Sequence, residues 1–94
     1  MQQVPYTCEK HIIVCVNKRE EGDCCSNVGG EEVYQKIKVF IREHGLTGKV
    51  WATRARCLGF CNNVGTTIVI YPDKLWFTEV TKEDLPQIYE HLER

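Results

Sequence analysis

Six cysteines are the residues of this chain whose type and spacing could do chemistry. They are Cys8, Cys15, Cys24, Cys25, Cys57 and Cys61. At about 6% of the 94 residues, they fall below the 8–10% typical of a secreted disulfide scaffold. The first residues also lack the charged segment and apolar stretch of an export signal. In a reducing cytosol, clustered cysteines more often bind metal or do redox chemistry, so we expect a cytoplasmic protein with a thiolate site.

The elements around these cysteines indicate how several sulfurs could meet. Residues 11–16 form a β-branched apolar run typical of a strand buried on both faces, and Cys15 lies at its end. A second strand is expected at 50–56, followed by Cys57. Loops after parallel strands gather at one end of a sheet. Four sulfurs can therefore converge there, whereas Cys8 precedes the first strand and is expected at the opposite end.

The remaining patterns complete an α/β order of β-α-β-β-β-α. An apolar face with helical spacing predicts a helix from Glu31 to about His44, ended by Gly45 and Leu46. Strands are expected at 66–71 and 75–80, joined by a turn, and a second helix reaches about Leu92. That helix could start after a Thr81 cap or after an Asp84 cap. The expected architecture is a mixed four-stranded sheet with helices packed on it.

The second cysteine pair lies in the run Cys57-Leu58-Gly59-Phe60-Cys61, a C-x3-C motif. Gly59 and Gly65 would let the backbone approach closely where a side chain would collide. Leu58 and Phe60 could shield a metal group from water, and solvent exposure is one of the factors that set the potential of an iron–sulfur cluster. Nearby cations could offset the negative charge of such a cluster: Lys18, Arg19, Arg54 and Arg56.

Four separated motifs together resemble the thioredoxin-like 2Fe-2S ferredoxins, relatives of a cluster-bearing subunit of NADH dehydrogenases and hydrogenases. The motifs are HIIVCVNKR (11–19), C-x3-GGEE (25–32), RCLGFC (56–61) and VIYPD-x2-WF-x2-V (69–80). The resemblance covers about residues 11–92. It implies a thioredoxin-like fold, a 2Fe-2S cluster with four cysteine ligands, electron transfer to redox partner proteins, and often a homodimer.

Carried over by this resemblance, the ligands are Cys15, Cys25, Cys57 and Cys61. Cys24 is the alternative to Cys25. Cys25 is preferred because the family has a glycine four residues after this ligand, and Gly29 is four residues after Cys25. The chain departs from the family in a short C-x9-C spacing between the first two ligands. It also has Thr66 where a proline often follows the cysteine loop, which predicts a more mobile loop after Cys61.

Other kinds of site compete with a cluster. A zinc ion held by four thiolates is the main alternative, although its knuckles usually use C-x2-C or close variants. A dithiol-disulfide oxidoreductase would need C-x-x-C at a helix N-terminus, and no such motif occurs in the sequence. A structural subunit that has lost its cluster would not need all four cysteines. We therefore expect a one-electron carrier rather than an enzyme.

The length and net charge of the chain limit the number of domains and the kinds of partner that we expect. We expect a single thioredoxin-like domain at 11–94 after an N-terminal lead-in at 1–10. With a net charge of −1, the chain lacks the excess of basic residues typical of a nucleic-acid binder. No apolar run is long enough for a membrane span. The aromatic residues of the later strands are expected in the core or on a dimer face: Trp51, Tyr71, Trp76 and Phe77.

Overall fold

The structure is a computed structural model that describes residues 1–16, 29–56, 58–59 and 65–93. The described elements follow the predicted order. They are β1 (Lys10–Cys15), α1 (Gly30–Glu43), β2 (Val50–Ala55), β3 (Thr66–Tyr71), β4 (Leu75–Val80), a 3-10 turn η1 (Lys82–Asp84) and α2 (Leu85–Glu93). Each strand lies within one residue of its predicted bounds.

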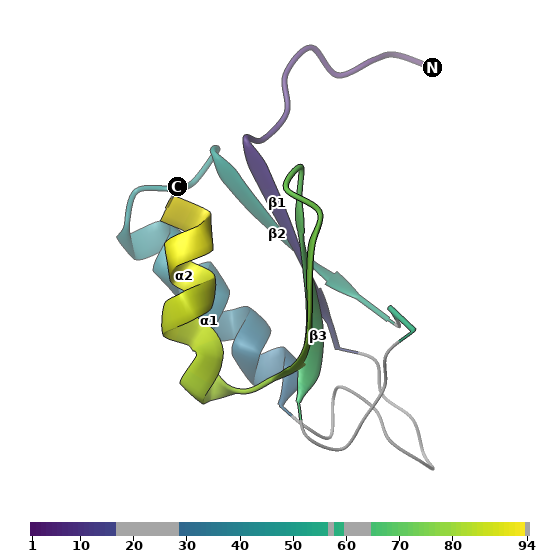
Figure 1. Ribbon diagram of the computed structural model, residues 1–94. Helices are drawn as coiled ribbons and strands as arrows, with labels where there is room; N and C mark the ends of the chain where they lie inside the picture. The colour runs from purple at the N-terminus through teal and green to yellow at the C-terminus, as the bar shows by residue number, and fades with distance from the viewer. Residues whose placement is uncertain (17–28, 57, 60–64, 94) are drawn as a thin grey trace.

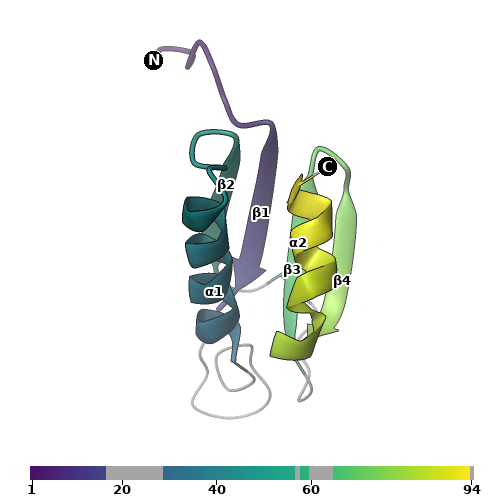
Figure 2. The same ribbon diagram turned by 90° about the vertical axis from the view of Figure 1, so that its left-hand side faces the viewer.

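The strands form one mixed sheet in the order β2-β1-β3-β4. β1 and β2 are parallel, joined by a crossover through α1, whereas β3 is antiparallel to both of its neighbours. Both helices lie on the same face of this sheet, as Figures 1 and 2 show from two directions. The mixed four-stranded α/β sheet predicted from the sequence is confirmed.

α1 buries the face that the sequence predicted and ends where it predicted. Gly45 has φ +66° and donates its N–H to the Arg42 carbonyl at 3.4 Å, while Leu46 donates to the Ile41 carbonyl at 2.9 Å. These two bonds make a Schellman motif, which satisfies carbonyls left free at the helix end. His44 caps the helix at the end of the apolar face and stacks on Phe40 with 4.1 Å between ring centroids.

Of the two starts that the sequence allowed, the Thr81 cap is present, and Asp84 is its partner in the capping box. The Thr81 N–H donates to Asp84 Oδ2 at 2.9 Å, which closes a capping box around η1. α2 then begins at Leu85, so Pro86 lies in its first turn, where a missing N–H costs no hydrogen bond. Tyr89 of α2 stacks on Phe40 of α1, with ring centroids 4.0 Å apart, and joins the two helices.

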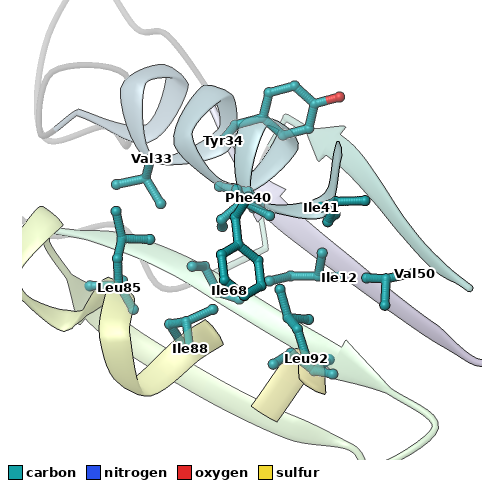
Figure 3. Packing of buried hydrophobic residues seen from close by; sticks show 14 residues of the cluster. Ile12, Val33, Tyr34, Phe40, Ile41, Val50, Ile68, Leu85, Ile88 and Leu92 are labelled. Atoms are coloured by element: carbon teal, nitrogen blue, oxygen red, sulfur yellow. The ribbon is translucent and has the colours of Figure 1, made fainter. Parts of the chain in front are cut away.

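The hydrophobic core fills the space between the helix pair and the covered face of the sheet (Figure 3). Its fully buried members include Ile12, Ile37, Ile68 and Ile70. Residues of one strand alternate between faces, so the positions next to these lie on the face without helices. For this reason His11 and Ile13 remain only half-buried. The expectation that β1 is buried on both faces holds only in part, because both helices cover the same side.

Neither helix in the described part of the chain is long and apolar enough to cross a membrane.

Candidate metal centre

Cys15 is the predicted ligand that the structure describes. It is the last residue of β1 and is 1% exposed. The other predicted ligands, Cys25 with its alternative Cys24, and Cys57 and Cys61, lie outside the described residues. What the structure places is the set of chain segments that lead into and out of them.

The thiol of Cys15 lies against the segment that leads into Cys57. Cys15 Sγ donates a hydrogen bond to the Arg56 carbonyl oxygen at 2.9 Å, and Arg56 directly precedes Cys57. The parallel register pairs Cys15 with Ala55, and the Val16 N–H donates to the Ala55 carbonyl at 2.8 Å. The ends of β1 and β2 therefore meet at one end of the sheet, as the sequence predicted.

The segment that leads out of the cysteine loop returns to the same place. Thr66, the first residue of β3, is 0% exposed, and its hydroxyl donates to the Cys15 carbonyl oxygen at 2.6 Å. Arg56 and Thr66, which come just before and just after residues 57–65, thus both contact Cys15. The greater mobility predicted for the loop after Cys61 concerns residues outside the described part of the chain, whereas Thr66 itself is anchored by its hydroxyl to the neighbouring strand.

The start of α1 lies at this end of the sheet too. Glu31, the second residue of α1, pairs with Arg54 near the end of β2, with 2.9 Å between Oε1 and Nη1. Gly29 precedes the helix with φ +87°, a conformation that favours glycine. Cys25 comes four residues before Gly29, and Cys24 five. Cys15 and the start of α1, which come before and after the segment that carries them, therefore lie at the same end of the sheet.

The two glycines of the cysteine loop serve different purposes. A Cβ on Gly65 would lie 2.4 Å from the Val80 carbonyl oxygen and 2.5 Å from the Glu79 carbonyl carbon. Gly65 therefore makes a close backbone approach to β4, where the β3–β4 register shifts, whereas the approach to ligand sulfurs predicted from the sequence involves residues outside the described part of the chain. A Cβ on Gly59 would meet nothing within 4 Å, but its φ is +90°. The positive φ of Gly59 favours glycine, and the close approach expected of it stays a prediction.

One of the basic side chains near the Cys15 end of the sheet already has an acidic partner. Arg54 was expected to offset the charge of a bound cluster. Its guanidinium instead pairs with Glu31 and lies 4.9 Å from the centre of the Tyr34 ring. Arg56 is exposed, and its carbonyl is the group that meets the Cys15 thiol. Among the described residues, no three His, Cys, Asp or Glu side chains gather as a metal site would require.

This arrangement fits a group held by thiolates. Cys15 supplies a soft sulfur donor in a buried position, and the described residues on either side of the cysteine loop, Arg56 and Thr66, both contact it. Soft thiolate ligands select iron–sulfur clusters, zinc or Cu(I) over hard cations. The described geometry is therefore compatible with a thiolate site at this end of the sheet.

Known proteins identify the class. The chain is 30% identical to a 2Fe-2S ferredoxin of Clostridium pasteurianum over 88 residues, which are 88% of this chain and 84% of that protein. It is 34% identical to a 2Fe-2S ferredoxin of Aquifex aeolicus over 85 residues, covering 86% of this chain and 76% of the relative. No protein-family model matches the chain.

A solved structure supports the same class. The crystal structure of the wild-type thioredoxin-like 2Fe-2S ferredoxin from Aquifex aeolicus superposes with a TM-score of 0.81 at 33% identity, covering 93% of this chain and 88% of that one. Two further matches are structures of that protein with serine in place of a cysteine, at two positions four residues apart. Cys57 and Cys61 have the same spacing.

The chain belongs to the thioredoxin-like 2Fe-2S ferredoxin family. Members of this family are electron carriers, and their cofactor is a 2Fe-2S cluster. The family, fold, cofactor class and electron-carrier function predicted from the sequence are confirmed at this level.

Proposed function

We propose that this chain is a one-electron carrier whose 2Fe-2S cluster is held by the thiolates of Cys15, Cys25, Cys57 and Cys61. The observation that carries the proposal is the contact of the Cys15 thiol with the peptide that leads into Cys57, at 2.9 Å. It brings Cys15 beside Arg56, the residue before Cys57, although 41 positions separate the two in sequence. Cys24 remains the alternative to Cys25.

The residues of the chain bind the cluster and limit its contact with water. When bound, the cluster supplies a one-electron couple. The Cys15 thiol must lose its proton to become a ligand, and a thiolate cannot donate a hydrogen bond. The bond to the Arg56 carbonyl therefore belongs to the protonated form, and Cys15 would give it up on binding the cluster. The burial of Cys15 limits solvent access, one of the factors that set a cluster's potential.

The same proposal extends to the setting of the protein. It makes and breaks no bond in a substrate, so it is not an enzyme. It exchanges electrons with redox partner proteins, without nucleic acid or membrane, in the cytoplasm. Residues 11–94 form a single domain, and residues 1–10 lead into it.

Anaerobic purification tests the cofactor directly. We expect two irons and two acid-labile sulfides per chain, because that is the composition of the cluster. After reduction with dithionite, we expect an S = 1/2 signal in electron paramagnetic resonance. One tightly held zinc without sulfide would instead support the zinc-site alternative. Reduction of insulin disulfides by cluster-free protein would support a dithiol oxidoreductase.

We further propose that two copies associate through the sheet face that carries no helix. Cross-strand pairing places on this face His11, Ile13, Trp51, Thr53, Val69, Tyr71 and Trp76. Three of the aromatic rings are well exposed: Trp51 (39%), Tyr71 (38%) and Trp76 (46%). None of the seven residues is Asp, Glu, Lys or Arg, which matches the depletion of charge at interface centres. A second copy fits such a face because no opposite charge is needed to complement it.

Trp76→Glu is expected to convert the dimer into a monomer, because it would bury a carboxylate without a partner at the interface. The molar mass in solution, measured by light scattering after size-exclusion chromatography, checks this. Val39→Glu is the matched control, since Val39 is 38% exposed but lies on α1, in the helix layer. A dimer that survives Trp76→Glu, or a wild-type protein that is monomeric, rules out this interface.

A further inference from the structure

Thr66 makes a contact that the cluster-binding role of the cysteines leaves unexplained. Its hydroxyl donates to the carbonyl oxygen of Cys15 at 2.6 Å, and both residues are buried, at 0% and 1% exposure. The distance is at the short end of the range for O–H···O hydrogen bonds. The two residues are 51 positions apart in sequence, so the bond fixes the end of β1 to the start of β3.

The bond acts on Cys15 from the side opposite to its thiol contact. The thiol faces the Arg56 carbonyl at the entry of the cysteine loop, and the Cys15 carbonyl is held by Thr66 at the exit of the loop. Threonine is β-branched, and its χ1 angle is restricted, so the hydroxyl is aimed with little freedom. Gly65, next to Thr66, is itself pressed against Val80. The position of the Thr66 hydroxyl is therefore closely fixed.

We infer that Thr66 is a positioning residue for the cluster: its hydroxyl orients the backbone of Cys15 and lowers the electrostatic cost of adding an electron beside it. This inference rests on the proposed function, because it assumes that Cys15 is a ligand. The Cys15 carbonyl belongs to a residue that would ligate a group whose negative charge grows on reduction. A hydroxyl proton on that oxygen offsets part of the dipole, so it favours the reduced state.

Removal of the hydroxyl has two expected effects. Thr66→Val keeps a similar shape but leaves the buried carbonyl without this donor. We expect the reduced-to-oxidised ratio at a given potential to fall about threefold, which at 59 mV per tenfold for a one-electron couple lowers the midpoint potential by about 30 mV. We also expect the cluster to be lost several times faster, because the ligand backbone is less well fixed.

The experiment compares the cluster-loaded wild type with Thr66→Val and Thr66→Ser. Anaerobic redox titration followed by visible absorption gives the midpoint potential, and the decay of that absorption with an iron chelator gives the rate of cluster loss. Thr66→Ser retains the hydroxyl and is expected to restore both values. Ile68→Val is the matched control, because it removes a methyl group from another fully buried residue of β3 without touching the Cys15 carbonyl. It should leave the potential unchanged.

The outcomes separate this inference from the proposed function. A cluster-loaded Thr66→Val variant with the wild-type potential and rate of loss would overturn the inference alone, as would a Thr66→Ser variant that behaves like Thr66→Val. A wild-type protein without iron and sulfide would overturn the proposed function and this inference with it. If Thr66→Val does not fold, Thr66→Ala against Thr66→Ser makes the same comparison.

Discussion

Cys25→Ser is expected to yield protein with almost no iron or sulfide, whereas Cys24→Ser should retain two of each per chain. Serine cannot replace the ligand well, because its hydroxyl does not ionise near neutral pH and is a hard donor where the cluster takes a soft one. Loss of outer hydrogen-bond partners alone typically lowers metal affinity 10–100-fold, so loss of a ligand should exceed about 100-fold. Iron and sulfide analysis of anaerobically purified protein measures the effect.

The adjacent cysteines make this a closely matched pair. Both substitutions change the same atoms in neighbouring positions, so a general effect on the segment should appear in both. Cys15→Ser should lose the cluster as Cys25→Ser does, and Cys8→Ser should keep it. If Cys24→Ser loses iron while Cys25→Ser keeps it, Cys24 is the ligand. If Cys15→Ser also keeps its full iron content, the site does not involve the end of β1.

Gly65→Ala should be the most damaging small substitution in the described part of the chain. The new methyl group would lie 2.4 to 2.6 Å from three backbone atoms of Glu79 and Val80. Backbone atoms in a sheet cannot rotate away as a flexible side chain can, so β3 and β4 must separate locally. We expect a loss of about 3 kcal/mol or more in the free energy of unfolding. For a domain of this size that is a large part of the total.

Urea unfolding of the cluster-free protein, followed by circular dichroism, measures this loss. Gly48→Ala is the matched control: Gly48 has φ +92° but a Cβ there would meet nothing within 4 Å. It should cost only the strain of a left-handed alanine, about 1–2 kcal/mol. Equal losses at the two positions would mean that the close approach at Gly65 relaxes freely.

The helices and strands could be predicted from the sequence because the patterns that define them involve residues close together in the chain. The end of α1 depends on Gly45 and Leu46, which are adjacent, and the structure confirms both roles. The start of α2 was ambiguous for an equally local reason. Thr81 caps the 3-10 turn, with Asp84 as its partner in the capping box, and α2 follows directly at Leu85.

The sheet faces could not be assigned from the sequence. Trp76 and Phe77 are adjacent and both apolar, so either could face the core. The pairing of Trp76 with Val69 and of Ile68 with Phe77 decides the question, because Ile68 lies in the core. Each helix pattern showed one apolar side but carried no information about which face of the sheet it covers. That choice leaves the aromatic residues of the other face exposed.

The site was predictable only in part. The position of Cys15 at a strand end, beside the segment that carries Cys57, followed from the parallel crossover and is confirmed by the contact with Arg56. The ligand set as a whole stays a prediction. The bond from Thr66 to Cys15 could not be foreseen, because it depends on the antiparallel register of β1 and β3, strands that are far apart in sequence.

The direction of β1 has a practical consequence for attaching this protein to other molecules. At one end of the strand, Lys10 Nζ donates to the His91 carbonyl at 2.6 Å and pairs with Asp73 at 3.0 Å, so both ends of the described chain leave from that side (Figure 1). Cys15 lies at the other end, about 16 Å away at 3.3 Å per residue. A purification tag, a fused enzyme or an electrode tether added at either terminus should therefore leave the Cys15 end of the sheet accessible.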